Sequence, residues 1–466
     1  MATLRKSTSG KPVGVSLGVA APLPRKRHSC LVLGAGLAGL AAAHRLKEKG
    51  WNVTVVEALE DRLGGRVYSH RFDEDKSLVC ELGGEWIGKD HKEMQRLCRF
   101  FGLKKMQHQY AYSFWDNGKE LKFTAPGKWP LSHPAGNKFK RLQKQFDKFT
   151  DSECMEMDKL DWWTQLEEAG FRLKDLLQRD LMDSTDFGET VRQVSAYVGA
   201  SEYFGAPGEG GNPTDEMDYK IVGGNSRLVD ELEKSVGKKN IHRGFLVRKI
   251  HQDTNGVEVS SSKGKLRAEL CICALPAHQL PEIGWGKTAL PDDQMLAARQ
   301  LQYARITKTA VLCSERFWRK HGPKKGGFSV FTSLASDFCF DSTLRQKGTG
   351  GILCSYAIGD KADDIAASPL HKLKDWIAGD VANAVKMGWH EEDVRKVAIK
   401  AKRQAWQDDK FYFGAYAFYR PGQWFTIRPI LQRPHRKVLF AGEHIADEQG
   451  FMEGAVVTGR DAADNL

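Results

Sequence analysis

The chain has no long apolar segment and no dense set of paired cysteines. No run approaches the roughly eighteen apolar residues that a membrane-spanning helix needs, so we expect no such span. The nine cysteines are an odd number scattered along 466 residues, which argues against a disulfide scaffold and favours a reducing compartment. Cys271 and Cys273 lie inside an apolar run with one residue between them, whereas structural zinc sites usually separate two cysteines by about two to four. We interpret them as buried thiols and expect no metal.

Acidic residues are absent from the start of the chain. Six basic residues precede residue 29: Arg5, Lys6, Lys11, Arg25, Lys26 and Arg27. They contribute much of the formal net charge of +11, so we expect a flexible basic tail over 1–28 rather than a nucleic-acid-binding face. The stretch Val13–Leu23 is mildly apolar, but glycines interrupt it and no clear cleavage site follows. We expect a cytoplasmic protein, and export by a degenerate N-terminal signal stays open.

The composition is otherwise that of a large globular protein. Hydrophobic residues make up 41% and aromatic residues 10%, including twelve tryptophans, which is enough for large cores and an aromatic-lined pocket. A chain of this length is too long for one compact core, so we expect two or three domains.

An apolar run meets three glycines spaced G-x-G-x-x-G at Gly34, Gly36 and Gly39. Gly34 allows a tight strand-to-helix turn, and Gly36 lets backbone N–H groups approach a pyrophosphate. Gly39 lets the helix pack closely on its strand. The turn, which includes Ala35, therefore predicts a phosphate site at a helix N-terminus.

A second apolar run, Trp51–Val56, ends in Glu57 about twenty positions after the glycines. This completes a βαβ unit whose carboxylate is placed to bind both ribose hydroxyls of a dinucleotide. A solvated glutamate at a strand end is the plainer alternative. A nicotinamide dehydrogenase has the same glycine motif, so the unit alone does not identify the cofactor.

Two more glycine-rich turns follow, Leu63-Gly64-Gly65-Arg66 and Leu82-Gly83-Gly84-Glu85-Trp86-Ile87-Gly88. Together with the first glycine motif and Glu57, this order resembles the flavin amine oxidases, the group that contains monoamine, polyamine and L-amino-acid oxidases. The resemblance implies an FAD cofactor. It implies that Arg66 contacts the pyrophosphate and that Gly83 and Gly84 run beside the isoalloxazine ring.

Lys308 interrupts the apolar run from Ile306 to Cys313, where a lysine is costly to bury unless it is hydrated or paired. It precedes the pair Phe317-Trp318 by nine residues, as in the amine-oxidase pattern. The resemblance implies that Lys308 holds a water next to flavin N5, which makes it our first candidate for a catalytic residue. A strand-edge lysine facing solvent is the alternative.

The aromatic stretch Phe411–Trp424 resembles the family segment that walls the substrate pocket. Ala415 falls where monoamine oxidases carry the cysteine joined to flavin, so the resemblance implies noncovalent FAD. Tyr416 would form one wall of a substrate cage, although an aromatic strand residue is often plain core.

The segments Phe440-Ala441-Gly442-Glu443 and Gly450-Phe451-Met452-Glu453-Gly454-Ala455 carry the most specific resemblance. A helix beginning near Phe451 and Met452 would aim its N–H groups at flavin N1 and O2. By resemblance, Glu443 would hydrogen-bond the ribityl or phosphate region. Phe451 would face Tyr416 across the substrate, and Val247 would bind the adenine end through its backbone.

We therefore expect a mixed α/β fold with a Rossmann-like FAD-binding domain, an interleaved substrate-binding domain and a helical insertion. The expected FAD-binding domain combines residues 29–90, 218–285 and 436–466. The largely helical insertion covers 91–217 and the substrate-binding domain 286–435. Trp162, Trp163 and Tyr197 recur at helical spacing in the insertion, so we expect them in its core.

The predicted reaction is hydride transfer from an L-amino acid to flavin N5, giving an imino acid that hydrolyses to an α-keto acid and ammonia. Oxygen or a quinone would accept the electrons, and a homodimer stays open. Trp86 stands where venom-type enzymes have a carboxylate-binding arginine, so Arg305 and Arg420 are the candidate replacements. Glu85 and nearby acids favour a basic side chain such as that of arginine or lysine, although a glutamate is more often at the surface or ion-paired. A monoamine or polyamine oxidase is the alternative, and a flavoprotein or nucleotide-binding scaffold without redox activity is a third.

Overall fold

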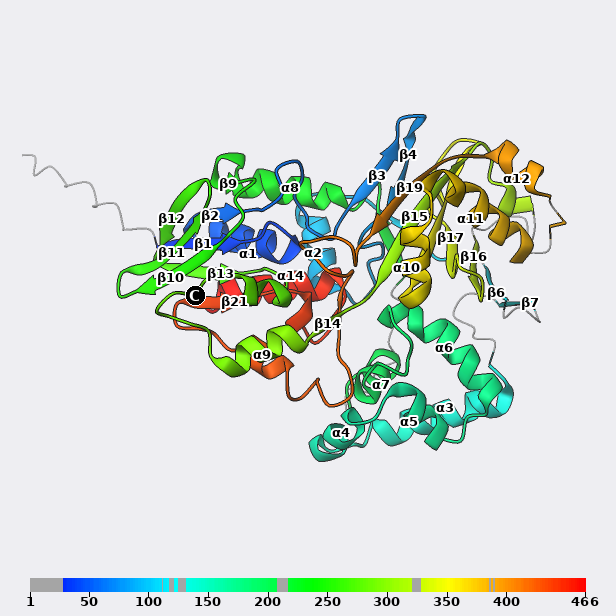
Figure 1. The fold of residues 1–466 in the computed structure, drawn as a ribbon, viewed down its shortest axis with the longest axis horizontal. Helices are drawn as coiled ribbons and strands as arrows, with labels where there is room; N and C mark the ends of the chain where they lie inside the picture. The colour runs from blue at the N-terminus through cyan, green and yellow to red at the C-terminus, as the bar shows by residue number, and fades with distance from the viewer. Residues whose placement is uncertain are drawn as a thin grey trace, which may run out of the picture.

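The computed structural model describes residues 28–110, 112–116, 121–124, 131–207, 217–320, 328–384, 387–388 and 390–466 (Figure 1). The predicted basic tail, apart from His28, lies outside the described residues. Among the helices that are described, none is long and apolar enough to cross a membrane.

A five-stranded parallel sheet forms around the first glycine motif. Its strand order is β21-β13-β1-β2-β9, and β1 pairs with both β13 and β2. The strands are β1 (Ser29–Leu33), β2 (Asn52–Val56), β9 (Ile241–His242), β13 (Leu270–Cys273) and β21 (Val438–Phe440). Most of their residues are buried, as expected for a parallel sheet covered on both faces. The parallel sheet and its helices confirm the predicted mixed α/β fold.

Alternate residues of β1 point into two different cores. Cys30 and Val32 pack against one layer of helices, whereas Leu31 and Leu33 pack on the other side. The helices of the first layer are α1 (Leu37–Glu48), α8 (Ser226–Val236) and α14 (Met452–Asp464), with α2 (Lys92–Phe100) against α14. The other side is covered in part by an antiparallel meander, β10 (Lys249–Asp253), β11 (Gly256–Ser261) and β12 (Gly264–Ala268).

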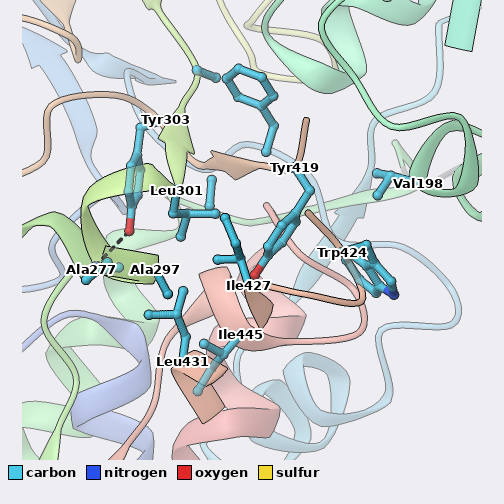
Figure 2. Packing of buried hydrophobic residues seen from close by; sticks show 14 of the residues in the cluster. Val198, Ala277, Ala297, Leu301, Tyr303, Tyr419, Trp424, Ile427, Leu431 and Ile445 are labelled. Atoms are coloured by element: carbon cyan, nitrogen blue, oxygen red, sulfur yellow. Dashed lines mark hydrogen bonds between the residues drawn. The ribbon is translucent and has the colours of Figure 1, made fainter. Parts of the chain in front are cut away.

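The region that joins this meander to the last strands is a buried hydrophobic cluster (Figure 2). Tyr303 accepts a hydrogen bond from the backbone N–H of Ala277 at 2.9 Å, and Tyr419 packs against Trp424. The elements here are α9 (Asp292–Gln300), α13 (Arg428–Gln432), the strand pair β14 (Gln302–Tyr303) and β20 (Ala417–Phe418), and the 3-10 helices η2 (Ala277–Glu282) and η4 (Glu443–Ile445). Within the aromatic stretch Phe411–Trp424, which its sequence predicts as a strand and a turn, the strand covers only Ala417–Phe418.

A second, seven-stranded sheet has the order β19-β15-β18-β17-β16-β6-β7. Its strands are β6 (Tyr112–Asp116), β7 (Leu121–Thr124), β15 (Ile306–Cys313), β16 (Phe328–Thr332), β17 (Phe338–Asp341), β18 (Gly351–Ile358) and β19 (Ala398–Ala405). One face packs against α10 (Gly359–Ala367), α11 (Leu370–Ala384) and α12 (Glu391–Val397). The face of β15 that carries Lys308, Ala310 and Leu312 points away from these helices, and Ala310 and Leu312 pack against the hairpin β3 (Ser69–Phe72) and β4 (Asp75–Glu81).

The predicted helical segment 91–217 contains five helices that form a separate group at the lower right of Figure 1. They are α3 (His133–Phe146), α4 (Asp151–Asp158), α5 (Trp162–Glu168), α6 (Leu173–Phe187) and α7 (Ala196–Phe204). Ser132, Asp161 and Ser195 cap three of them through their side chains. Trp162 and Trp163 are buried in the core of this group, as predicted, and Tyr197 packs against it.

The same segment also contains strands that a largely helical insertion does not include. β5 (Lys105–Gln107) pairs with β8 (Tyr219–Ile221), and β6 and β7 extend the seven-stranded sheet. The remaining short 3-10 helices are η1 (Lys238–Asn240) and η3 (Phe317–Lys320).

Candidate active site

One cavity of about 860 Å³ runs from the glycine turn after β1 to the seven-stranded sheet. All but two of the residues predicted for the site line it. They are Gly34, Gly36, Glu57, Arg66, Gly83, Gly84, Trp86, Val247, Lys308, Tyr416, Glu443, Phe451 and Met452. The exceptions are Ala35 and Gly39. Ala35 donates its N–H to Glu57, and Gly39 packs against the Gly34 carbonyl oxygen. Residues more than four hundred positions apart thus border one continuous space.

The glycine turn holds its shape through close backbone contacts. Gly34 has a φ of +92°, which favours glycine, and a Cβ on Gly39 would lie 1.9 Å from the Gly34 carbonyl oxygen. In the described structure no side chain caps the N-terminus of α1, and Leu37 and Ala38 of its first turn line the cavity. The first-turn N–H groups are thus placed to bind an anion, which fits the predicted phosphate site.

Glu57 is 7% exposed and lies at the end of β2. Its Oε2 accepts a hydrogen bond from the Ala35 N–H at 2.8 Å, and its Oε1 accepts one from the Leu59 N–H at 2.9 Å. Burial raises the pKa of Glu57, and these two backbone donors partly oppose the shift. The carboxylate therefore ties the glycine turn to β2, and its contact with a ribose stays a prediction.

Arg66 and Glu443 form an ion pair of 2.6 Å between Nη1 and Oε1 in the middle of the cavity. Arg66 also donates to the Ala415 carbonyl oxygen at 3.1 Å, and Gly450 N–H donates to Glu443 Oε2 at 3.0 Å. Glu443 thus joins the second glycine-rich turn to the segment before α14. The predicted contacts of Arg66 with a pyrophosphate and of Glu443 with the ribityl region remain predictions.

The third glycine-rich turn packs against backbone and against α14. A Cβ on Gly83 would lie 1.9 Å from the Arg66 carbonyl oxygen, and one on Gly84 would lie 3.0 Å from Met452 Sδ. Phe451 is the N-cap residue of α14, without a side-chain cap hydrogen bond, and Met452 begins the helix. The N-terminus of α14 therefore borders the cavity, as the resemblance implies.

Lys308 is buried, with 3% of its side chain exposed. Its Nζ donates to Glu85 Oε2 at 2.5 Å and to the Gly83 carbonyl oxygen at 3.0 Å. Burial lowers the pKa of the Lys308 ammonium, but the Glu85 carboxylate outweighs it and raises the pKa above its ordinary value. Lys308 is therefore a paired, charged lysine at the cavity wall and not a strand-edge lysine facing solvent.

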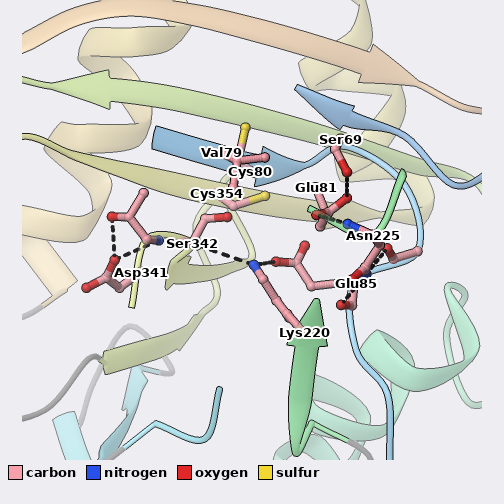
Figure 3. Close-up of polar contacts among 12 residues, drawn as sticks. Ser69, Val79, Cys80, Glu81, Glu85, Lys220, Asn225, Asp341, Ser342 and Cys354 are labelled. Atoms are coloured by element: carbon pink, nitrogen blue, oxygen red, sulfur yellow. Dashed lines mark hydrogen bonds and ion pairs between the residues drawn. The ribbon is translucent and has the colours of Figure 1, made fainter. Parts of the chain in front are cut away.

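Lys220 is a functional candidate that the sequence analysis missed. Its Nζ donates to the other oxygen of Glu85 at 2.6 Å and to the Ser342 carbonyl oxygen at 3.3 Å (Figure 3). Glu85 is thus held between two ammonium groups, and the expectation that it attracts a basic substrate side chain is wrong. The missed signal was a lysine inside the short apolar run Tyr219–Val222, the same pattern that pointed to Lys308.

Aromatic side chains enclose the cavity next to Lys308, and we call this part the cage. Tyr356 Oη and Tyr416 Oη are 2.8 Å apart, and Tyr416 Oη also donates to the Asp186 carbonyl oxygen at 2.9 Å. The cage consists of Trp86, Met182, Thr185, Asp186, Glu202, Lys308, Phe331, Phe338, Tyr356, Tyr416 and Phe451. Ring contacts connect Trp86 to Phe338 and Phe338 to Tyr356, which sequence reasoning did not identify.

Neither arginine proposed for a substrate carboxylate lines this cavity. Arg305 is paired with Glu189, Asp360 and Asp363. Arg420 hydrogen-bonds Gln193 at 3.1 Å on the surface. The one cation among the described cage residues is Lys308, which Glu85 already engages.

Comparisons with known proteins agree with this geometry. Residues 37–466 match the family model described as flavin containing amine oxidoreductase. An L-amino-acid oxidase from Bothrops moojeni is 26% identical over 464 residues, covering 93% of this chain and 88% of that protein. An L-amino acid dehydrogenase from Synechocystis sp. is 24% identical over 473 residues, covering 94% and 95%.

Two solved structures share the fold at low sequence identity. A putrescine oxidase bound to putrescine has a TM-score of 0.80 at 20% identity, covering 94% of this chain and 98% of that one. The cyclohexylamine oxidase from Brevibacterium oxydans has the same TM-score, identity and coverage.

Proposed function

Because the chain belongs to the flavin-containing amine oxidoreductases, we propose that it oxidises the C–N bond of basic L-amino acids with noncovalently bound FAD. The chain is a flavin-dependent oxidoreductase of CH–NH2 groups. The observation that carries the proposal is the single cavity that joins the glycine turn to the cage, with Lys308 between them. FAD, when bound, takes the two electrons of the oxidation and passes them to an acceptor.

The residues of the chain have separate roles in this proposal. Leu37 and Ala38 N–H groups bind the phosphates, and the α14 N-terminus stabilises negative charge at the other end of the cofactor. Trp86, Tyr416 and Phe451 enclose the amine and exclude water. The third N–H of the Lys308 ammonium, beyond its bonds to Glu85 and Gly83, holds a water at the cavity wall.

Two observations support a basic amino acid as substrate. The relatives that match over most of both chains are named as L-amino-acid oxidases and a dehydrogenase. Asp186 and Glu202 line the cage at the side formed by α6 and α7, where they favour a cationic side chain. The negative C-terminal end of α6 adds to the same preference.

A diamine or polyamine is the second candidate substrate. It is favoured by the cage composition, because the one described cation, Lys308, is engaged by Glu85. A substrate carboxylate would then have to be bound by neutral donors such as the hydroxyls of Tyr356 and Tyr416. A diamine carries no carboxylate and would not need such a partner.

An anaerobic screen for flavin bleaching separates the two. L-arginine, L-lysine, putrescine and spermidine are mixed with the purified holoenzyme, and the products are identified. Bleaching by the amino acids, with an α-keto acid as product, supports the proposal. Bleaching by the amines alone, with an aldehyde as product, rejects it in favour of the second candidate. A flavin that none of the amines bleaches would favour a nonredox scaffold.

Oxygen or a quinone is the proposed acceptor, and hydrogen peroxide would be released with oxygen. We propose the cytoplasm as the location, because all nine cysteines are buried and free, which suits a reducing compartment. The homodimer stays a prediction.

A further inference from the structure

Three charged side chains meet behind the cage wall, each less than 5% exposed. Glu85 Oε1 accepts from Lys220 at 2.6 Å (Figure 3). Its Oε2 accepts from Lys308 at 2.5 Å. We call these three residues the buried triad. Both carboxylate oxygens are used, so neither ammonium can move without breaking a charge-assisted hydrogen bond.

The members of the buried triad come from three separate elements. Lys308 lies in β15 and Lys220 in β8, whereas Glu85 follows the glycine pair after β4. The Asn225 amide donates to the carbonyl oxygens of Gly84 and Glu85 at 3.0 and 2.8 Å, which fixes this turn. The triad is therefore built to hold Lys308 in one orientation toward the cavity.

The triad carries one more positive charge than negative. Without Lys220, Glu85 would neutralise Lys308 completely. Glu81 is the nearest further carboxylate, and it is bonded by the Asn225 N–H at 2.9 Å and the Ser69 hydroxyl at 2.7 Å rather than by either ammonium. Removing Lys220 therefore makes the surroundings of Lys308 more negative, and it also raises the pKa of Glu81 further, because Lys220 opposes the effect of burial on that carboxyl.

The other titratable groups near the triad come from the strands around it. They are Glu81 on β4, Cys354 and Tyr356 on β18, Asp341 on β17, and His108 and Tyr110 after β5. Burial, with a contribution from Lys220, holds the pKa of His108 well below its usual range. His108 therefore adds no positive charge near neutral pH.

We propose that Glu85 and Lys220 are positioning residues that orient Lys308 and keep a net positive charge beside the reacting end of the cofactor. The proposal rests on the proposed placement of the flavin next to Lys308. A positive charge there stabilises the extra electrons of the reduced cofactor and the negative charge that forms on dioxygen. With dioxygen as the acceptor, forming hydrogen peroxide takes two electrons and two protons. A bound, singly protonated reduced flavin would supply both electrons and one proton. The water held by Lys308 would donate the second proton and recover one from solvent.

The test uses holoenzyme reduced with dithionite, so that it does not depend on knowing the substrate. Lys220→Met is expected to lower the midpoint potential of the bound flavin. It is expected to slow the reaction of the reduced enzyme with oxygen by about tenfold, because the positive charge on the far side of the Lys308–Glu85 pair is lost. Lys220→Gln, which keeps an N–H donor, is expected to behave alike and serves if the Met variant does not fold.

Glu85→Gln is expected to act differently. It leaves two buried ammonium groups without a shared carboxylate, so their repulsion and burial lower the pKa of Lys308. The pH above which the oxygen reaction slows should then fall. The double variant Glu85→Gln/Lys220→Met again leaves one positive charge. Its midpoint potential should return toward that of the parent, and its rate of reaction with oxygen should be within about threefold of the parent rate.

Lys374→Met is the control, because Lys374 is likewise a lysine paired with a carboxylate, although it is only half-buried, and it lies on α11 behind the seven-stranded sheet. It should change neither readout. Thermal unfolding of each apoprotein confirms that the variants fold.

An unchanged potential in folded Lys220 variants overturns the proposal. A double variant slower than both single variants also overturns it, because a merely structural role predicts additive damage. A parent that does not react with oxygen leaves the potential as the deciding measurement.

Discussion

The Gly39→Ala substitution is expected to remove the cofactor and destabilise the fold. A Cβ at this position would lie 1.9 Å from the Gly34 carbonyl oxygen, 3.1 Å from the Gly34 carbonyl carbon and 3.3 Å from Val32 Cγ1. Two of the three neighbours are backbone atoms of the glycine turn, so no side chain can rotate to make room. The turn and α1 must separate by at least about 1 Å before the contact is tolerable.

The cost follows from close packing on both sides of the contact. Added methyl groups in well-packed interiors typically cost about 1–3 kcal/mol, and a contact between two backbone segments belongs at the upper end. We expect a loss of about 3 kcal/mol in the free energy of unfolding. Because Gly34 shapes the predicted phosphate site, the same displacement should also abolish flavin binding.

Gly379→Ala is the matched control, since it is the same substitution within helix α11. A Cβ at Gly379 meets no atom within 4 Å. Alanine in a helix interior is favoured over glycine by about 0.5–1 kcal/mol, so this variant should be slightly more stable than the parent and keep its flavin.

The assay combines two measurements on purified proteins. Visible absorbance gives the flavin content, and urea unfolding of the apoproteins gives the stability free of the cofactor. A Gly39→Ala protein with the flavin content and unfolding free energy of the parent would refute the close-packing argument. Equal losses in both variants would show that the effect has nothing to do with the contact.

Three further predictions concern the cofactor and its surroundings. Lys308→Met should slow reoxidation by oxygen far more than flavin reduction by substrate, as measured by stopped-flow absorbance; equal slowing would count against a water held by Lys308. Acid precipitation should release all of the flavin into the supernatant, because Ala415 offers no sulfur for a covalent bond, and a yellow pellet would contradict this. Burial lowers the pKa of His444 to about 4. As the pH falls below 6.5, the His444 imidazole is therefore protonated in the unfolded chain but stays neutral in the folded protein. The apoprotein should lose about 2 kcal/mol of stability between pH 7 and pH 5 from this group, and His444→Gln should remove that part of the loss in urea unfolding.

The dinucleotide end of the molecule could be predicted because its signals are local. The glycine turn, β1, α1 and β2 follow one another within thirty residues, and each requirement, such as the absence of a Cβ at Gly39, concerns a near neighbour. The apolar run around Lys308 likewise predicted β15 with its bounds. The resemblance then connected these segments to the last helix, α14, which no local pattern could have done.

The partners of Lys308 were harder to predict, because they lie far apart in the sequence. Glu85 and Lys220 are separated by 135 residues, and each reaches the triad through a different strand or turn. A lysine within an apolar strand indicates that it has a buried partner, but it does not identify that partner. The same reasoning that selected Lys308 would have selected Lys220, and only the structure shows that one carboxylate serves both.

The substrate end of the cavity depends on parts of the chain that carry no glycine signature. Tyr356 on β18 meets Tyr416 in the loop before β20, and Tyr416 donates a hydrogen bond to the carbonyl oxygen of Asp186 in the last turn of α6. Since Glu85 is paired with Lys220 and Lys308, the proposed preference for a basic substrate rests on Asp186 and Glu202 in the helical segment. The helical segment is anchored to the cage through Tyr416, and its described residues contribute no strand to the five-stranded parallel sheet. Changes within it can therefore alter which amine enters the cage while leaving the cofactor cleft intact, which is why sequence patterns that identify the cofactor do not identify the substrate.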